Sequence, residues 1–275
     1  MILTSMNKKF FHWLKIIVLI YCLLGICIFY LQDYFLFHPQ ALQKDHQYSF
    51  SMPHKEINIS YTEKSNMNII QFLTDKPVKG VILYFHGNKR NIARYAPVAP
   101  NFTSNGYEIW MIDYPGFGKS TGRFNEKNLY DWALTFYKLA RARFAPDSII
   151  IYGRSLGSGI ASQLASVRDC RMLILETPYY SLPSIIDSYL PIYPSNTLIQ
   201  YEFPTWKYLQ KVTAPVIIFH GSNDWTIPLR NSKKLTPYLK PGDEFVIIPG
   251  GKHNNLNDFP LFQQTLDSLL RNNHL

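Results

Sequence analysis

Tyr152-Gly153-Arg154-Ser155-Leu156-Gly157-Ser158-Gly159 is the most informative segment of this chain. It follows a buried-type apolar run at 148–152 and precedes an apolar stretch of helical length. Gly-x-Ser-x-Gly in this setting predicts a sharp strand–turn–helix corner, because the two glycines allow neighbouring chain to come close while the serine hydroxyl projects above the sheet. We predict that Ser155 is a nucleophile. An ordinary glycine-rich turn is the alternative.

Apolar runs of strand length alternate with longer amphipathic segments on both sides of this corner. Several runs are almost continuous in Val, Ile, Leu, Phe and Tyr, as expected of strands buried on both faces of a parallel sheet. The predicted strands are 56–61, 68–73, 81–85, 108–113, 148–152, 171–175, 216–219 and 244–248. The predicted helices are 92–104, 126–144, 158–166, 229–239 and 259–270. This pattern predicts an open, mostly parallel α/β sheet with an antiparallel leading pair, and it makes 177–214 an insertion over one edge.

A serine hydroxyl is a weak nucleophile unless a base takes its proton and an acid orients that base. In a sheet of this kind the partners follow the serine in the order acid, then histidine, at the carboxyl ends of later strands. Asp224 lies just beyond the predicted strand 216–219, and His253 lies just beyond the last one. We therefore predict Asp224 as the acid and His253 as the base.

Other acids and histidines fit this order less well. Asp113 and Glu176 follow earlier strands, and Asp187 lies in the insertion. His86 and His220 each precede a glycine at a strand end, where an imidazole more often braces a loop than acts as a base. The remaining histidines lie in the apolar N-terminal segment or away from any predicted strand end: His12, His38, His46, His54 and His274.

Acyl transfer at Ser155 would also need backbone N–H groups that hold an oxyanion. The N–H of Leu156 is aimed at the same place, at the N-terminus of the predicted helix, where the helix dipole favours negative charge. The loop after strand 81–85 supplies a second donor in such folds. His86-Gly87-Asn88 forms that loop here, and the N–H of Asn88 is the candidate; a plain turn is the alternative.

Gly116-Phe117-Gly118-Lys119-Ser120 looks like the end of a phosphate-binding loop. That motif would require glycine at position 113, where Asp113 stands, and no helical apolar pattern begins at Lys119. The segment is instead predicted to be a tight turn that leaves a strand. The sequence has no HExxH motif, paired cysteines or carboxylate cluster that would indicate a metal, and we expect no cofactor.

The N-terminal segment is long and apolar enough to cross a bilayer. Ile16 to Leu31 carries no charge, and a helix over 10–31 would be about 33 Å long at ~1.5 Å per residue. A buried core helix would show polar positions every three to four residues, and a cleaved signal peptide would show a small-x-small site; neither pattern is present. The lysines at 8, 9 and 15 precede the middle of the span, so the positive-inside rule predicts a cytoplasmic N-terminus and a large domain on the other side.

Composition and charge exclude several classes of protein. The 275 residues are 47% hydrophobic and 17% charged, which is a globular composition, long enough for one full core plus an appendage. The net charge is +9, but the basic residues are scattered, so they do not form the gathered basic surface of a nucleic-acid-binding protein. Cys22 and Cys27 lie in the apolar segment, which leaves Cys170 alone and excludes a disulfide within the domain.

Taken together, the motifs resemble those of the α/β-hydrolase superfamily, and most of all its small membrane-anchored serine hydrolases of the ABHD type. The motifs are His86-Gly87-Asn88, Asp113-Tyr114-Pro115-Gly116-Phe117-Gly118, Gly153-Arg154-Ser155-Leu156-Gly157-Ser158, Leu175-Glu176-Thr177-Pro178, His220-Gly221-Ser222-Asn223-Asp224 and Gly251-Lys252-His253-Asn254. The resemblance implies an eight-stranded sheet flanked by helices, with Ser155 as nucleophile, Asp224 as orienting acid, His253 as general base, and Leu156 and Asn88 as oxyanion donors. Relatives usually continue the first motif with small residues, whereas Lys89-Arg90 stands here.

These observations predict a cytoplasmic segment 1–9, a transmembrane anchor 10–31, a connector 32–51 and an α/β-hydrolase domain 52–275 with a cap at about 177–214. The expected function is a single-pass membrane serine hydrolase that cleaves esters or thioesters of apolar or lipid-like acyl groups. The many aromatic residues of the cap favour a hydrophobic lid, although they could equally pack the insertion onto the sheet. A peptidase, an acyltransferase and a membrane-tethered binding protein without catalysis are the alternatives.

Overall fold

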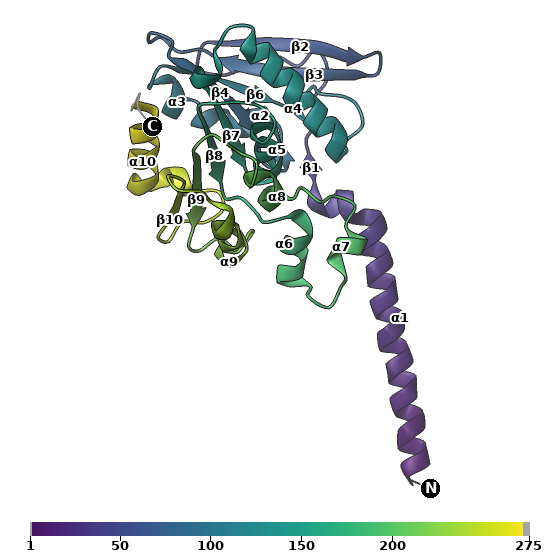
Figure 1. Ribbon diagram of the computed structural model, residues 1–275. Helices are drawn as coiled ribbons and strands as arrows, with labels where there is room; N and C mark the ends of the chain where they lie inside the picture. Colours follow the sequence, from purple (N-terminus) through teal and green to yellow (C-terminus); the bar gives the residue numbers. More distant parts are fainter. Residues whose placement is uncertain (1, 272–275) are drawn as a thin grey trace.

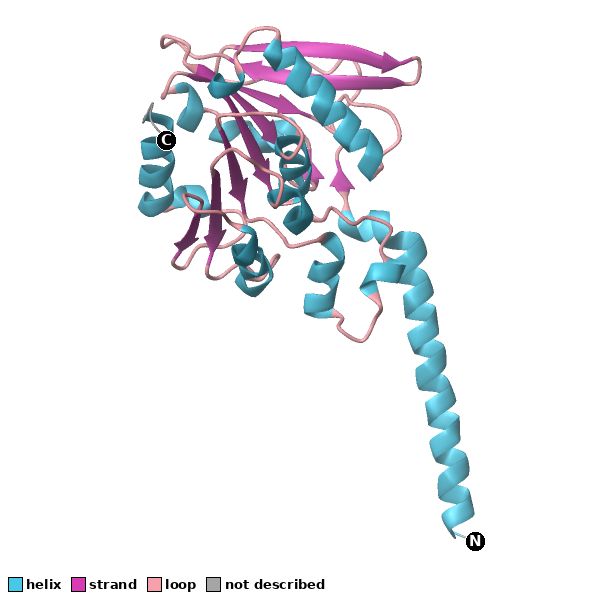
Figure 2. Ribbon diagram, viewed as in Figure 1, coloured by secondary structure: helices cyan, strands magenta, loops and turns pink. Residues whose placement is uncertain are grey.

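The computed structural model describes residues 2–271, with a mixed eight-stranded sheet at its centre (Figures 1 and 2). The strands lie in the order β10-β9-β8-β7-β4-β6-β3-β2, with β2 and β3 antiparallel to their neighbours and the other strands parallel. Their bounds are β2 His54–Thr62, β3 Ser65–Phe72, β4 Gly80–Phe85, β6 Tyr107–Ile112, β7 Ile149–Arg154, β8 Met172–Glu176, β9 Val216–Gly221 and β10 Glu244–Ile248. All eight predicted strands and the antiparallel leading pair are confirmed, with ends displaced by three residues at most.

Apolar side chains fill both faces of the sheet, because successive residues of a strand point to opposite sides. Leu83 and Ile151 lie in one core with Phe136 of α4 (Glu126–Arg141). Ile82 and Ile150 lie in the other core, beneath α3 (Pro100–Thr103) and α10 (Pro260–Arg271). The sheet therefore forms the middle layer of a three-layer α/β domain, which explains why its parallel strands read as continuous apolar runs rather than alternating ones.

The helices differ from the prediction where proline interrupts them. The predicted helix 92–104 is wrong as a single helix: it consists of α2 (Ile92–Tyr95), a 3-10 turn (Ala96–Val98) and α3 (Pro100–Thr103), because Pro97 and Pro100 provide no backbone N–H. The predicted helix 229–239 becomes α9 (Leu229–Ser232) and a 3-10 segment (Lys233–Tyr238) that contains Pro237. The helices α4, α5 (Leu156–Ala165) and α10 (Pro260–Arg271) lie close to their predicted ranges.

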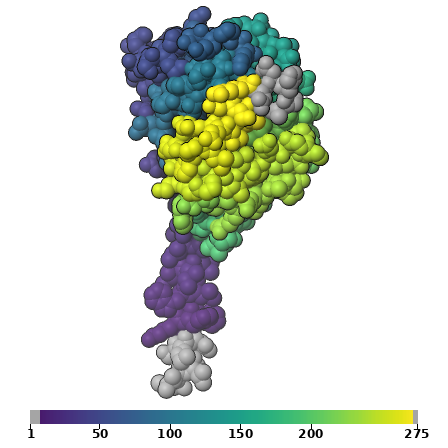
Figure 3. All heavy atoms as spheres, turned by 90° about the vertical axis from the view of Figure 1, so that its left-hand side faces the viewer, coloured from purple at the N-terminus to yellow at the C-terminus, as the bar shows by residue number. Residues whose placement is uncertain are grey.

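The long N-terminal helix α1 (Ile2–Leu36) projects from the domain (Figures 1 and 3). It continues past Leu31, so the first residues of the predicted connector are helical. Its apolar part, Lys8–Leu36, is long enough to cross a membrane, and its side chains are largely exposed outside a membrane. The chain then forms β1 (His38–Pro39), which pairs in parallel with β5 (Lys89–Arg90). The sequence analysis missed this pair, since two residues show no periodicity.

The insertion after β8 contains α6 (Leu182–Tyr189), α7 (Ser195–Leu198) and α8 (Thr205–Leu209). Its helices α6 and α7 extend from the domain beside α1 (Figure 1), and we call residues 177–214 the cap. Part of the cap packs into the core: Tyr179 and Phe203 are fully buried. Other parts are exposed, so packing onto the sheet accounts for only some of the aromatic residues of the cap, and the hydrophobic lid stays a prediction.

Candidate active site

Ser155 lies at a strained corner between β7 and α5. Its φ of 51° and ψ of −118° fall in a region that residues with a side chain rarely adopt. The Ser155 N–H donates to the Glu176 carbonyl of β8 at 2.9 Å, and the Ser155 carbonyl accepts a bond from the Ser158 hydroxyl at 2.6 Å. Gly157 is required here, because a Cβ atom on it would lie 2.0 Å from the Phe85 carbonyl oxygen. The predicted sharp turn is confirmed.

The structure brings Ser155, His253 and Asp224 together, although they are far apart in the sequence. His253 Nε2 lies 3.0 Å from Ser155 Oγ, and His253 Nδ1 lies 2.8 Å from Asp224 Oδ2. A carboxylate oxygen can only accept, so Nδ1 carries the proton and Nε2 is left as the acceptor for the serine hydroxyl. All three residues are less than a tenth exposed, which strengthens these polar contacts relative to water.

The loop after β9 holds the Asp224 carboxylate in place. Asp224 Oδ1 accepts the backbone N–H groups of Thr226 at 2.8 Å and Ile227 at 2.9 Å, which leaves Oδ2 for His253. His220 Nε2 also lies 3.4 Å from Oδ2. Burial lowers the pKa of the His220 imidazole below its ordinary value of 6.5, while the charge of Asp224 opposes this shift. A neutral His220 does not compete with His253 for the negative charge of Asp224.

The other acids and histidines at strand ends have structural partners away from Ser155. His86 Nε2 lies 3.1 Å from Asp113 Oδ1, and both side chains are fully buried. Burial raises the pKa of the Asp113 carboxyl, and the hydrogen bond from His86 opposes the shift. Glu176 accepts the Tyr152 hydroxyl at 2.7 Å, and Asp187 accepts the Ser195 hydroxyl at 2.5 Å. The expectation that His86 and His220 brace loops is confirmed.

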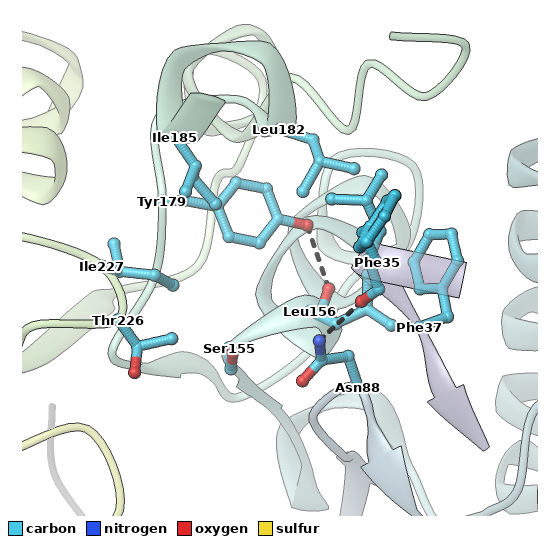
Figure 4. Close-up of a pocket in the computed structure, with 11 residues that line it drawn as sticks. Phe35, Phe37, Asn88, Ser155, Leu156, Tyr179, Leu182, Ile185, Thr226 and Ile227 are labelled. Carbon is cyan, nitrogen blue, oxygen red and sulfur yellow. Dashed lines mark hydrogen bonds between the residues drawn. The ribbon is translucent and has the colours of Figure 1, made fainter. Parts of the chain in front are cut away.

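A cavity of about 190 Å³ opens at Ser155, and its walls are mainly apolar (Figure 4). Asn88 and Leu156 line it together with Ser155, so both predicted oxyanion donors belong to residues at the nucleophile. The loop lies close to the corner: a Cβ atom on Gly87 would be 3.5 Å from the Ser155 Cβ. The apolar lining comes from α1, the cap and the loop after β9: Phe35, Leu36, Phe37, Tyr179, Leu182, Ile185 and Ile227.

The end of α1 is a part of this site that the sequence analysis missed. Asn88 Nδ2 donates to the Leu36 carbonyl at 2.6 Å, and the His38 N–H donates to the Asn88 carbonyl at 2.9 Å. The loop that carries Asn88 is therefore held from both sides by the segment that follows the apolar helix. No sequence signal could have found these bonds, because Leu36 contributes only backbone and lies far from Asn88 along the chain.

A second cavity, of about 220 Å³, also adjoins Ser155 and shares Phe35, Asn88 and Thr226 with the first. Lys89, Arg94 and Arg154 line it, and its lining contains no aspartate or glutamate. Arg154 is largely buried and its Nε lies 3.3 Å from Glu176 Oε1. Burial is the largest single effect and lowers the pKa of Arg154, but the Glu176 carboxylate together with the Tyr84 and Tyr152 hydroxyls outweighs it, and the pKa of Arg154 is raised. Within the described residues, no group of three or more His, Cys, Asp or Glu side chains could hold a metal ion.

Comparisons with known proteins find a family model, curated relatives and solved structures that this chain resembles. The family model described as "Serine aminopeptidase, S33" matches residues 76–201. The uncharacterized protein YfhR of Escherichia coli is 27% identical over 178 residues, 62% of this chain and 62% of YfhR. Human protein ABHD12B is 29% identical over 202 residues, 64% of this chain and 56% of ABHD12B. The Pyrococcus furiosus esterase Pf2001 has the same fold, with a TM-score of 0.65 at 17% identity over 85% of this chain and 98% of the esterase.

The sheet order, the strained serine corner and the match to Pf2001 define the α/β-hydrolase fold. Among proteins with this fold, the chain is similar in sequence to α/β-hydrolases of the ABHD type. The predicted fold class and the predicted resemblance are both confirmed. The chain spans about three fifths of the length of the curated relatives YfhR and ABHD12B.

Proposed function

We propose that this protein is a membrane-anchored serine hydrolase that cleaves carboxylic esters or thioesters of apolar acyl groups. The observation that carries the proposal is the unbroken hydrogen-bond path from Ser155 Oγ to His253 Nε2 and from His253 Nδ1 to Asp224 Oδ2. The path has the order that nucleophilic catalysis by serine requires. Its cavity is concave, largely apolar and adjacent to Ser155.

The proposed reaction has two halves. His253 Nε2 takes the proton of Ser155 Oγ while Oγ bonds to the substrate carbonyl carbon, and the N–H groups of Leu156 and Asn88 hold the oxyanion. The carbon–leaving group bond then breaks, and His253 returns its proton to the leaving group. In the second half His253 takes a proton from water, the resulting hydroxide attacks the acyl-enzyme, and Ser155 Oγ leaves with that proton. The products are a carboxylic acid and the alcohol or thiol.

The two cavities at Ser155 support a substrate with two unlike ends. The apolar cavity suits an acyl chain, because burying methylene groups is favourable. The second cavity suits a leaving group that carries negative charge, since the described residues place no acidic side chain within ion-pair distance of Lys89 or Arg94. Arg154 contributes less to the positive charge of this cavity than Lys89 and Arg94, because Glu176 already neutralises its charge.

The apolar helix α1 supports membrane anchoring. Its window Lys8–Leu36 passes the length and hydropathy requirements for one span. We propose that residues 10–31 form the anchor, that residues 1–9 are cytoplasmic and that the hydrolase domain lies on the opposite side of the membrane. The positions of Lys8, Lys9 and Lys15 support this orientation.

Two related functions use the same residues. The matching family model carries the description of a serine aminopeptidase, and an acyltransferase would differ only in using an alcohol in place of water. The apolar cavity favours an ester of an acyl chain over a peptide. The solved structure Pf2001, which shares the fold, is an esterase.

A combined labelling and turnover experiment tests the proposal. The protein is expected to react with a fluorophosphonate probe and to hydrolyse p-nitrophenyl esters with an optimum in acyl-chain length. Ser155→Ala should abolish both signals, because no other described serine contacts His253. Unchanged labelling of Ser155→Ala would exclude Ser155 as the nucleophile. Labelling of the wild type without hydrolysis of any ester would favour the transferase or peptidase instead.

A further inference from the structure

The cap contacts α1 well below the domain, at the middle of the apolar helix. The Tyr21 ring stacks on the Tyr193 ring with 4.6 Å between centroids and 3° between planes. The Tyr21 hydroxyl donates to the Ile192 carbonyl at 3.0 Å, and the Tyr193 hydroxyl donates to the Tyr21 carbonyl at 3.0 Å. The Tyr193 ring also packs close to Gly25, where a Cβ atom would be in ordinary contact with the ring at 3.5 Å. These contacts set the position of the cap along α1.

A second contact joins the cap to α1 nearer the domain. The Gln200 N–H donates to Gln32 Oε1 at 2.7 Å, and Gln32 Nε2 donates to the Leu198 carbonyl at 3.3 Å. Together the two contacts hold the cap alongside α1 from Tyr21 to Gln32, as Figure 1 shows for α7. Residues 192–200 of the cap therefore lie beside α1, along the part of that helix from Tyr21 to Gln32.

The depth of this contact follows from helix geometry and rests on the proposed membrane anchor. Tyr21 lies about 16 Å along α1 from Phe10, at about 1.5 Å per residue. The hydrocarbon core of a bilayer is about 30 Å thick. If the span begins at Phe10, Tyr21 lies near the middle of the bilayer, and the part of the cap that touches it lies in the same half as the domain.

The side chains of this part of the cap are compatible with the hydrocarbon core of a bilayer. No charged residue occurs from position 188 to position 201. We call residues 189–193 the cap tip; Tyr189, Leu190 and Ile192 are 51%, 42% and 69% exposed outside a membrane. Trp225 is 85% exposed, and its carbonyl accepts the Tyr189 hydroxyl. Apolar side chains exposed together in this way indicate contact with an apolar partner, and an exposed tryptophan is typical of the membrane interface.

Most of the backbone N–H groups of the cap tip, though not that of Ile192, are paired or replaced by proline, which suits a medium without water, where unpaired N–H groups are costly. Pro191 and Pro194 have no N–H. The Leu190 N–H donates to the Ile186 carbonyl at 2.7 Å, and the Tyr193 N–H donates to the Leu190 carbonyl at 3.1 Å. The hydroxyls of Tyr21 and Tyr193 are satisfied by the contacts with α1 and the cap described above.

We propose that the cap tip is embedded in the bilayer leaflet on the domain side, and that the acyl chain of a membrane lipid ester reaches Ser155 from that leaflet by passing between α1 and α6. The apolar cavity supports this route, because Phe35 and Leu36 at the end of α1 and Leu182 and Ile185 of α6 form its walls (Figure 4). The embedded cap and the anchor together give a chain a continuous apolar path to the nucleophile.

A depth measurement tests the insertion directly. The full chain, with Cys22→Ala, Cys27→Ala and Cys170→Ala, receives one NBD-labelled cysteine by Ile192→Cys and is placed in phosphatidylcholine nanodiscs. The label at position 192 should show blue-shifted emission and resist reduction by aqueous dithionite. A matched chain with Val167→Cys, exposed and just beyond the far end of α5, should show neither effect. Equally fast reduction of both labels would overturn the proposal.

An activity measurement tests the route. Ile192→Asp should lower the hydrolysis of a long-chain monoacylglycerol in phosphatidylcholine vesicles by about tenfold, because a carboxylate in the leaflet is strongly disfavoured. It should leave the hydrolysis of soluble p-nitrophenyl acetate unchanged, since Ile192 does not line the cavity. Val167→Asp should change neither rate. Equal loss on both substrates, or no loss on either, would overturn the route. The NBD label reports depth without turnover, so a failed insertion is distinguishable from a failed hydrolase assignment.

Discussion

Ser155 adopts a backbone conformation that costs about 1–3 kcal/mol for a residue with a side chain. The surrounding structure compensates for it with bonds to the Glu176 carbonyl and from Ser158, and with a glycine at 157 where any Cβ would collide with the Phe85 carbonyl. The hydroxyl is thereby held above the sheet toward His253. The sequence could predict this residue, because the local motif contains the two glycines, Gly153 and Gly157, that such a turn requires.

Asp224 and Asp187 offer a matched test at the same scale. Asp224→Asn should lower kcat by about 10³–10⁴-fold, because an amide in place of the carboxylate favours the wrong His253 tautomer and stops Nε2 from accepting the Ser155 proton. Asp187→Asn, in the cap, should change kcat little, since Asp187 bonds Ser195 and not His253. Steady-state kinetics on p-nitrophenyl butyrate would measure both. Similar losses for the two variants would show that Asp224 does not have the proposed role.

At the scale of elements, runs of apolar residues identified every strand of the central sheet, because strands buried on both faces leave a continuous signal. The helices were less predictable. Pro97 and Pro100 divide the predicted helix 92–104 into three short turns, because proline has no backbone N–H to donate. The prediction rested on amphipathic spacing, which carries no information about a missing N–H. The two-residue pair of β1 and β5 had no sequence signal, and yet it ties the end of α1 to the loop that contains Asn88.

This tie gives a prediction for the loop. Asn88→Ala removes the bond from Nδ2 to the Leu36 carbonyl while keeping the backbone N–H proposed to hold the oxyanion. We expect kcat on p-nitrophenyl butyrate to fall by about ten- to hundredfold with KM little changed, because a small displacement of an oxyanion donor is costly.

Asn91→Ala is the matched control for this loop. It removes a similar bond, from Asn91 Nδ2 to the Gln40 carbonyl at 3.1 Å, and Asn91 does not line either cavity at Ser155. Its kcat should stay close to that of the wild type. A rise in KM without a fall in kcat for Asn88→Ala would point to substrate binding rather than oxyanion support.

At the scale of the whole molecule, the apolar helix α1 also takes part in the site. Phe35, Leu36 and Phe37 at the end of α1 line the cavity at Ser155, and Tyr21 and Gln32 hold the cap. An apolar helix that served only as a tether would not need these contacts. With the proposed membrane anchor, this arrangement places Ser155 near the membrane surface, where acyl lipids are concentrated.

The orientation of the molecule is testable by protease accessibility. Protease added to spheroplasts should digest the hydrolase domain and leave a tag fused before Lys8 protected, because the lysines at 8, 9 and 15 favour the cytoplasmic side. Detergent permeabilisation, as the control, should expose the tag as well. Full protection of the domain in intact spheroplasts would reverse the proposed orientation.

The chain's local patterns were sufficient for the sheet, the serine corner, the order of Ser155, Asp224 and His253, and the apolar span, because each depends on periodicity, turn chemistry or strand ends. The distances among the three side chains, the pairing of Arg154 with Glu176, the bond from Asn88 to Leu36 and the contact of the cap with α1 required the folded structure. These features join residues that are distant along the chain, and several use backbone atoms that every residue shares. Packing in three dimensions alone decides which of those groups meet.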